Sequence, residues 1–319
     1  MANPTVRTDI PLVRIVLAFL AMYLIWGSTY LAIRFGIESI PPFLMIGGRF
    51  MIGGLSLYWF ARWRGAPKPT RREWRNAALP GILMLAGGTG LVAYAEQWVP
   101  SGLTALLVAT VPLWIVMMDW VRPNGYRPGL PTIGGLVLGF AGVAFLMSPG
   151  FSGGEAIDLF GALMILLATS LWASGSLVSR HTVDSHPITG MGMRMITGAA
   201  VLILVSGVFG EWSQFNLTAV TLKSWLALWY QIVFGTVAFM AYLWLLKVST
   251  PAKAATYAYV NPAVALVLGA VLADEVLSLQ IGVASLIIIV AVAIIVTRRA
   301  KPAAATEPAC PDPEVKKAA

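Results

Sequence analysis

The feature that most constrains this chain is a succession of long apolar stretches, each close to the length of a membrane-spanning helix. A spanning helix needs about 20 mostly apolar residues. Ten such stretches follow one another, at residues 12–34, 42–61, 76–98, 100–121, 130–148, 157–179, 187–209, 224–246, 251–272 and 277–297. Charged residues make up only 11% of the 319 residues, whereas a soluble domain carries about 25%. The sequence therefore predicts an all-α polytopic membrane protein with ten transmembrane helices.

The segments outside these stretches are short and polar. We expect residues 1–11 to form a cytoplasmic N-terminus, residues 149–156 a loop, and residues 298–319 a disordered cytoplasmic tail, because the tail is rich in Ala, Pro, Lys and Glu. Basic residues precede the first apolar stretch, as in a signal peptide, but no small-residue cleavage pattern follows, so this stretch is expected to be a retained helix. The one cysteine, Cys310, lies in the tail, which excludes an internal disulfide.

The chain also repeats itself. Residues 25–34 (Ile-Trp-Gly-Ser-Thr-Tyr-Leu-Ala-Ile-Arg) align with residues 171–180 (Leu-Trp-Ala-Ser-Gly-Ser-Leu-Val-Ser-Arg). Further pairs follow in the same order: Pro42, Gly47, Arg49 and Gly53 match Pro187, Gly192, Arg194 and Gly198, and Pro112 matches Pro262. The ordered series indicates a duplication, with a first repeat at 12–148 and a second at 157–297.

Because each repeat has an odd number of spans, the second must enter the membrane upside down relative to the first. The charges agree with this inversion. Six basic residues lie between Arg62 and Arg75, after the second span, whereas the corresponding loop at 210–223 carries one, Lys223. Inverted repeats are typical of transporters that work by alternating access, with a substrate site near the membrane midplane between the two halves.

The basic residues also predict the orientation. With the N-terminus inside, 18 of the 22 Lys and Arg residues lie on the cytoplasmic side, and only Arg34 and Lys223 lie outside. An excess of basic residues marks cytoplasmic loops, so both termini are expected in the cytoplasm. The same sidedness accounts for the net charge of +8, and we expect no nucleic-acid partner.

Three features together resemble a known family. They are the opening Trp26-Gly27-Ser28-Thr29-Tyr30, the duplicated five-span unit, and Tyr259-Val260-Asn261-Pro262 followed by Asp274-Glu275. Over residues 12–297 the chain resembles the EamA family of the drug/metabolite transporter superfamily, which includes bacterial ten-helix exporters, some of them amino-acid exporters. The resemblance implies a multi-pass exporter of the bacterial inner membrane, with a central cavity lined by helices one, three, four, six, eight and nine. One departure is Gly125, where such repeats commonly place a glutamate, as the second repeat does with Glu275.

Two pairs of residues are candidates for a hinge or gate. Pro112 and Pro262 lie near the middle of spans four and nine, where proline removes a backbone N–H and frees a carbonyl; each is either part of a paired kink or an ordinary membrane-helix proline. Arg49 and Arg194 lie seven residues past Pro42 and Pro187, about 10 Å along a helix. For the arginines we favour a structural or gating role over direct contact with substrate.

The candidate substrate-binding residues are uncharged aromatic, hydroxyl and amide side chains within the spans. They are Trp26, Ser28, Thr29, Tyr94, Trp172, Ser174, Ser176, Thr256, Tyr257, Tyr259 and Asn261. Aromatic faces hold apolar side chains or cationic amines. The alternative is ordinary packing or membrane-interface anchoring. Trp26 and Tyr257 are the pair that a midplane site between the halves would combine.

The charged residues favour one class of solute. The spans carry no Asp or Glu at mid-depth, and Glu96 and Asp119 lie near helix ends. The absence of a mid-span carboxylate argues against exchange of protons for a cationic drug, and favours a neutral or zwitterionic metabolite, amino acids above all. Because Glu96 is present, an exporter of drugs or lipophilic cations remains the alternative.

An enzyme is not expected. The sequence has no His-Glu-x-x-His motif, and its two histidines, His181 and His186, flank one loop. No cofactor or metal site is predicted. The expected partners are a small-molecule substrate and the lipid bilayer, and a monomer is expected. A membrane helper subunit that moves no solute is the alternative from another functional class.

Overall fold

The computed structural model describes residues 11–122, 127–148, 158–179, 182, 185–249, 253 and 256–299. Ten spans lie in these residues: α1 (Leu12–Gly36), α2 (Pro42–Trp63), α3 with η1 and α4 (Arg71–Gly81, Ile82–Gly90, Leu91–Ala95), α5 with α6 (Ser101–Val108, Val111–Val121), α7 (Leu130–Met147), α8 (Leu159–Ser179), α9 (Pro187–Val208), α11 (Leu222–Val248), α13 (Tyr257–Leu272) and α14 (Leu279–Arg299). Nine are long and apolar enough to cross a membrane, and α13 is a shorter apolar helix. The prediction of a ten-helix all-α membrane protein is confirmed.

Some predicted features lie outside the described residues. They are most of the N-terminal segment 1–11, the loop 149–156, Gly125, His181 and the tail beyond Arg299 with Cys310.

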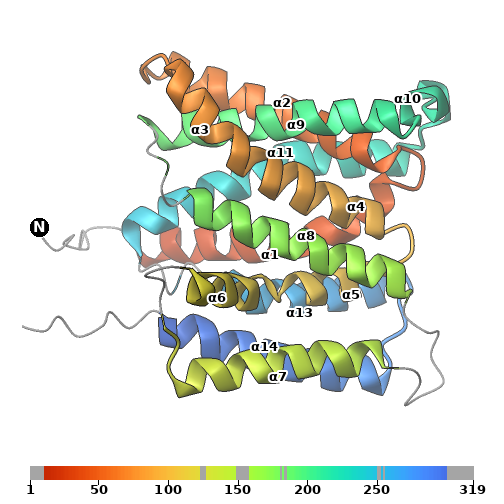
Figure 1. Cartoon of the computed structure of the whole chain (residues 1–319). Helices are drawn as coiled ribbons and strands as arrows, with labels where there is room; N and C mark the ends of the chain where they lie inside the picture. The colour runs from red at the N-terminus through yellow and green to blue at the C-terminus, as the bar shows by residue number, and fades with distance from the viewer. Residues whose placement is uncertain are drawn as a thin grey trace, which may run out of the picture.

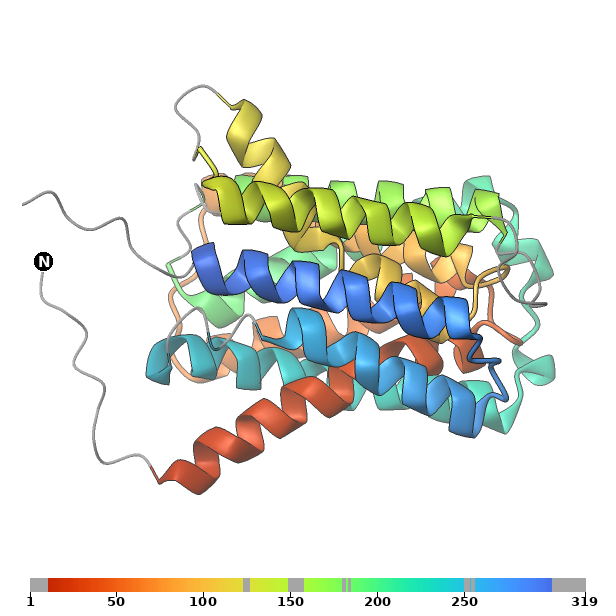
Figure 2. The ribbon, with the colours of Figure 1, turned by 90° about the horizontal axis from the view of Figure 1, so that it is seen from below.

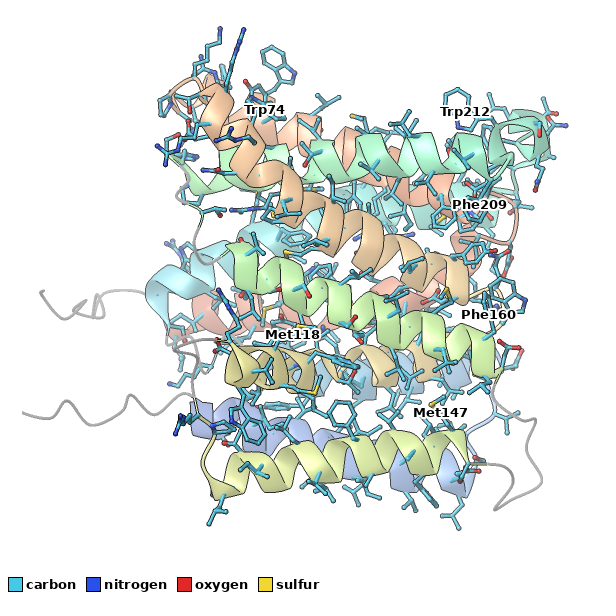
Figure 3. The ribbon with its side chains drawn as sticks, viewed as in Figure 1. Trp74, Met118, Met147, Phe160, Phe209 and Trp212 are labelled. Carbon is cyan, nitrogen blue, oxygen red and sulfur yellow. The ribbon has the colours of Figure 1, made fainter. Side chains whose placement is uncertain are left out.

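The spans lie side by side along one common direction (Figure 1). In that view α2 and α9 lie at the top, α1 and α8 in the middle, and α7 with α14 at the bottom. The short helix α10 (Glu211–Gln214) and the 3₁₀ turn η2 (Leu217–Ala219) follow α9. We call the end of the molecule that carries α10 and Trp212 the α10 end, and the end that carries Trp74 at the start of α3 the α3 end (Figure 3).

The two halves are inverted. Helix α1 starts at the α3 end (Figures 1 and 2), whereas α8 starts at the α10 end, where Phe160 lies (Figure 3). The packing is reciprocal: α1 packs against α11 and α13, and α8 packs against η1, α5 and α6, which are the equivalent spans of the other half. The pairs α2–α9 and α7–α14 each join equivalent spans of the two halves.

Small residues bring the paired helices close together. A Cβ at Gly192 of α9 would lie 2.9 Å from the carbonyl oxygen of Gly54 in α2. Glycine at such a crossing lets two helix backbones approach. On the outside of the bundle large apolar side chains are exposed, such as Val208 at 86% and Leu130 at 84%. A surface of this kind is suited to lipid.

Spans three and four depart from regular α-helix. Span three starts with a capping box, in which Thr70 and Glu73 bond each other's backbone N–H groups, and continues through the π-helix η1. Span four is interrupted between Val108 and Val111, and Pro112 lies in the first turn of α6. Pro262, its counterpart, lies inside the continuous helix α13. Only the first proline therefore accompanies a helix break, and a hinge role for either remains a prediction.

Candidate functional site

An aromatic group forms where α1 of the first half meets α11 and α13 of the second. The Trp26 ring lies 5.2 Å from Phe239 and 5.4 Å from Tyr242, both on α11, and 5.0 Å from Tyr257 on α13, measured between ring centroids. Tyr242 and Tyr257 are 5.9 Å apart. Edge-to-face and tilted rings at these distances attract one another. We call these four residues the α1 aromatic cluster.

The backbone of α1 reaches α13 because residue 27 is glycine. A Cβ at Gly27 would lie 2.7 Å from the Val264 side chain and 3.3 Å from the carbonyl oxygen of Asn261. A larger residue would push the two helices apart. Gly27 thus holds the tryptophan that precedes it against the start of α13.

Polar groups surround the α1 aromatic cluster without adding charge. The Ser28 Oγ lies 2.6 Å from the Tyr230 hydroxyl of α11, and Tyr23 and Thr256 share a hydrogen bond between their hydroxyls. Asn261 is 6% exposed, and its Oδ1 accepts no hydrogen bond in the described part of the chain. A buried amide oxygen without a partner is costly, which keeps Asn261 a candidate acceptor for a bound solute.

The structure therefore brings together five predicted residues: Trp26, Ser28, Thr256, Tyr257 and Asn261. Two others on the same helices have different contacts. Thr29 donates to the Ile25 carbonyl of its own helix at 2.8 Å. Tyr259 packs against the apolar core formed by α5, α6, α7, α8 and α14, although its side chain also bonds Thr256.

The predicted residues of the second half meet the first half elsewhere. Trp172 packs on Gly88 in η1, where a Cβ would lie 2.9 Å from its Cε3. Ser174 donates to the Ser170 carbonyl at 2.9 Å and lies 3.4 Å from the sulfur of Met118, which is labelled on α6 in Figure 3. Ser176 donates to the Trp172 carbonyl at 2.8 Å.

Tyr94 belongs to a third group, at the α10 end. Its ring stacks on Phe43 at 5.1 Å and lies 5.1 Å from Trp98 and 5.9 Å from Phe209. Trp98 in turn contacts Phe160 at 5.5 Å, and Figure 3 shows Phe160 and Phe209 at this end. Its ring contacts set Tyr94 apart from the α1 aromatic cluster and match an interface belt.

Each of the two intramembrane arginines donates a hydrogen bond to an uncharged side chain. Arg49, only 5% exposed, donates from Nη1 to Oε1 of Gln231 on α11 at 2.7 Å. A Cβ at Gly235 would lie 3.2 Å from its Nη2, so that glycine leaves room for the guanidinium. Arg194 donates from Nη2 to the Thr182 hydroxyl at 3.1 Å. Arg49 thus links the second span of the first half to the third span of the second half.

Sequence reasoning missed four residues of α11: Tyr230, Gln231, Phe239 and Tyr242. Gln231 was detectable, because an amide inside an apolar span is a candidate by default. Phe239 and Tyr242 are three residues apart and so share a helix face, which is a weak signal in a span with many rings. Among the described residues, no group of three or more His, Cys, Asp or Glu could hold a metal ion.

The chain is similar in sequence to a family of transporters and to several of its relatives. The model of the EamA-like transporter family matches residues 13–148 and again residues 159–297. The inner membrane transporter YedA of Escherichia coli (strain K12) is 42% identical over 265 residues, which are 82% of this chain and 83% of YedA. The transporter YoaV of Bacillus subtilis (strain 168) is 26% identical over 284 residues, covering 87% and 94% of the two chains.

A solved structure shares the fold. One crystal structure aligns with a TM-score of 0.62 at 22% identity, covering 91% of this chain and 98% of the other. The family match spans both halves, and the relative at 42% identity covers most of the chain. Together with the ten-helix inverted fold, these matches show that the chain is a multi-pass membrane transporter and belongs to the EamA-like transporter family.

Proposed function

We propose that this protein is an inner-membrane exporter of small neutral or zwitterionic metabolites, amino acids above all, and that it works by alternating access. The observation that carries the proposal is the uncharged composition of the α1 aromatic cluster. Trp26 from the first half meets Phe239, Tyr242 and Tyr257 from the second. A solute held at this junction touches both halves, so that it is exposed to either side as the halves move relative to each other.

The chemistry around the cluster suits an amino acid. The four rings offer an apolar surface for a side chain and, at their faces, attraction for an ammonium group. Asn261 Oδ1 is a buried acceptor without a partner in the described residues, suited to the same ammonium group. Ser28 Oγ donates to the Leu24 carbonyl and the Tyr230 hydroxyl lies 2.6 Å from Ser28 Oγ, so a solute carboxylate would accept the Tyr230 hydrogen bond in exchange for that contact. None of these protein groups carries a charge, which suits a solute without net charge.

The test is transport by the purified protein. In liposomes that contain only this chain, labelled neutral amino acids should exchange across the membrane. In cells, overproduction should raise tolerance to toxic neutral amino-acid analogues and lower their content. Protection against lipophilic cations alone would support the drug-exporter alternative. A purified protein that moves no solute in the full panel would instead indicate a helper subunit.

The orientation is a separate proposal: the α3 end faces the cytoplasm, and so do both termini. Arg71, Arg72 and Arg75 lie at that end, in the first turns of α3, and basic residues favour the cytoplasmic side. After Cys310 is replaced, single cysteines near Glu38, Glu155 and Lys223 should label from outside an intact cell. Those near Lys68, Arg127 and Lys253 should be protected. Outside labelling near Lys68 would overturn the orientation.

A further inference from the structure

Glu96 is a buried acid that the proposed substrate site does not use. It follows α4 directly, at the α10 end, in the hairpin that joins spans three and four. Its side chain is 0% exposed, and neither carboxylate oxygen has a hydrogen-bond partner among the described residues. A buried carboxylate that accepts no hydrogen bond is strongly disfavoured in its ionised form. The side chain therefore needs a proton or a cation.

The nearest cation does not bond the carboxylate. Arg34 of α1 donates from Nη1 to the main-chain carbonyl of Glu96. Glu275, the nearest acid, is held at the start of α5, where it accepts from Ser101 N and Oγ, each at 2.7 Å, and from Gly102 N at 2.8 Å. These bonds hold the Glu275 carboxyl at the start of α5, where it acts electrostatically on Glu96.

The other elements around Glu96 bring little further charge. Tyr30 lies one turn before Arg34 on α1, and a tyrosine is uncharged near neutral pH. On the α8 side, Asp158 caps its own helix by accepting from Gly161 N at 2.6 Å. Helix α2 has no charged residue from Pro42 to Gly48, and α5 has none. The buried Glu211 of α10 caps the start of α2, accepting from Phe43 N at 3.2 Å and from Leu44 N at 2.8 Å. Arg34 and Glu275 therefore dominate the electrostatics of the Glu96 carboxyl.

The pKa of Glu96 follows from these surroundings. Burial raises the pKa of this carboxyl well above its usual range, the negative Glu275 raises it further, and Arg34 lowers it in part. Nothing in the described surroundings bonds the ionised carboxylate, because Arg34 bonds the main-chain carbonyl of Glu96. Loss of the proton would give Arg34 a second and stronger acceptor.

We propose that Glu96 is a proton-binding site at the α10 end, and that its protonation, with Arg34 as the alternative partner, makes transport depend on the pH at that end. Protonation of Glu96 would be coupled to transport through α1, because this helix carries both Arg34 and the Trp26 of the α1 aromatic cluster. Tyr30 lies between them on the same helix. The dependence of flux on pH rests on the proposed function, whereas the proton site does not.

The proton site can be tested without a substrate. The infrared C=O stretch of protonated carboxyl groups is followed during a pH titration of the purified full-length protein. At pH 6.5 an ordinary glutamate, with a pKa of about 4.3, is roughly 99% ionised. We expect wild type to keep a protonated-carboxyl band at that pH, and Glu96→Gln to lose the part of it that Glu96 contributes. Burial also raises the pKa of Glu211, so Glu211→Gln identifies the share of that residue. Glu38→Gln is the matched control, because Glu38 lies at the same end but is exposed and paired with Lys223 at 2.6 Å. A band that is equal in wild type and Glu96→Gln would overturn the proposal.

A second variant tests the proton site in case Glu96→Gln does not fold. Arg34→Met removes the cation that lowers the pKa of Glu96, so the band should titrate at a higher pH, with at least about tenfold tighter proton binding. An unchanged titration would count against the site. The direction in which thermal stability changes with pH is also predicted. An acid whose pKa is raised in the folded state stabilises the protein at low pH, and this stability is lost as the pH rises through that pKa. Wild type should therefore melt progressively below Glu96→Gln as pH rises.

The last test measures how the rate of transport depends on pH. Exchange of a neutral amino acid in liposomes should change at least about fivefold between pH 6 and pH 8 on the side of the α10 end, and less than about twofold in Glu96→Gln. Equal pH dependence in the two proteins would overturn the coupling. A preparation that shows the Glu96 band but moves no amino acid supports the proton site and contradicts the proposed substrate.

Discussion

Trp26 and Trp172 open the same sequence pattern in the two halves, yet they lie in different surroundings. Trp26 contacts Phe239 and Tyr242 of α11, whereas Trp172 packs on Gly88 of η1. Helix α11 and the span that contains η1 are the third spans of their halves. The repeat thus sets each tryptophan against an equivalent helix, and the side chains of that helix decide its role. Trp26, which lies among other aromatic rings, is therefore a candidate for solute binding, whereas Trp172, which packs on a glycine, is expected to serve mainly in packing.

The largest effect expected from this comparison is on stability, at Trp172. Replacing a buried aromatic residue by alanine costs about 3–5 kcal/mol. Because Trp172 is only partly buried, Trp172→Ala should lie at the lower end, about 3 kcal/mol. Solute affinity in the surviving molecules should stay within about twofold, since the ring contacts η1 and not the cluster. Unfolding in detergent and a binding titration, on the same preparation, give both quantities.

The control for this variant is Trp59→Ala, because Trp59 on α2 is 66% exposed and leaves no internal cavity. Its melting temperature should stay near that of wild type. A large loss of solute affinity in Trp172→Ala, at normal stability, would contradict the assignment of Trp172 to packing.

For Trp26 the expected loss is in affinity. If its ring and that of Tyr257 contact solute, then Trp26→Ala and Tyr257→Ala each remove about 1–3 kcal/mol of binding, a five- to 150-fold weakening. Trp26→Phe should recover part of it. If Trp26→Ala instead lowers the melting temperature as much as Trp172→Ala does, with unchanged affinity, the two tryptophans have the same packing role.

Much of the fold was predictable because prolines and polar loops mark the span ends. The predicted stretches 42–61 and 187–209 correspond to α2 (Pro42–Trp63) and α9 (Pro187–Val208), each starting at its proline. Span three was placed at 76–98, but it runs from Arg71 to Ala95. Its first turn is charged and capped by Thr70, so hydropathy alone did not include it. The π-helix η1 could not be predicted from the local sequence. Its glycines make room for side chains of helices that are distant in the sequence.

The candidate site was predictable in part. The pairing of Trp26 with Tyr257 followed from the repeat topology, and the two rings are 5.0 Å apart. The same topology gave Trp172 an equal role, because the difference between the two tryptophans lies in other spans, at Gly88 and Phe239. A single sequence does not show which residues of a uniformly apolar helix face a partner. For the same reason Tyr94 was grouped with residues that its ring contacts keep separate.

A smaller effect is expected at Gly88, where it tests how tightly Trp172 is packed. A Cβ at Gly88 would lie 2.9 Å from Trp172 Cε3, and overpacking of this kind costs about 1–3 kcal/mol. Gly88→Ala should therefore lower stability by about 1–2 kcal/mol in wild type and by much less in Trp172→Ala, where the ring is gone. The double-mutant cycle measures this coupling. Gly134→Ala on α7 is the control, because nothing lies within 4 Å of its Cβ; equal costs at both glycines would argue against the contact.

The smallest effect compares the serines two residues after each tryptophan. Ser28 Oγ donates to the Leu24 carbonyl at 2.7 Å and lies 2.6 Å from the Tyr230 hydroxyl, so Ser28→Ala leaves that hydroxyl without its partner. The expected cost is about 0.5–1.5 kcal/mol. Ser174 bonds mainly a carbonyl of its own helix, and Ser174→Ala should cost less than about 0.5 kcal/mol.

Tyr230→Phe separates the two explanations for a loss at Ser28. If the bond to Tyr230 is responsible, Tyr230→Phe alone should cost a similar amount, and the double variant Ser28→Ala with Tyr230→Phe should cost little more than either single change. Additive losses would mean that the two hydroxyls act independently. A cost at Ser174 equal to that at Ser28 would show that the two halves use their serines alike, and that the difference between them is confined to the partners of the tryptophans.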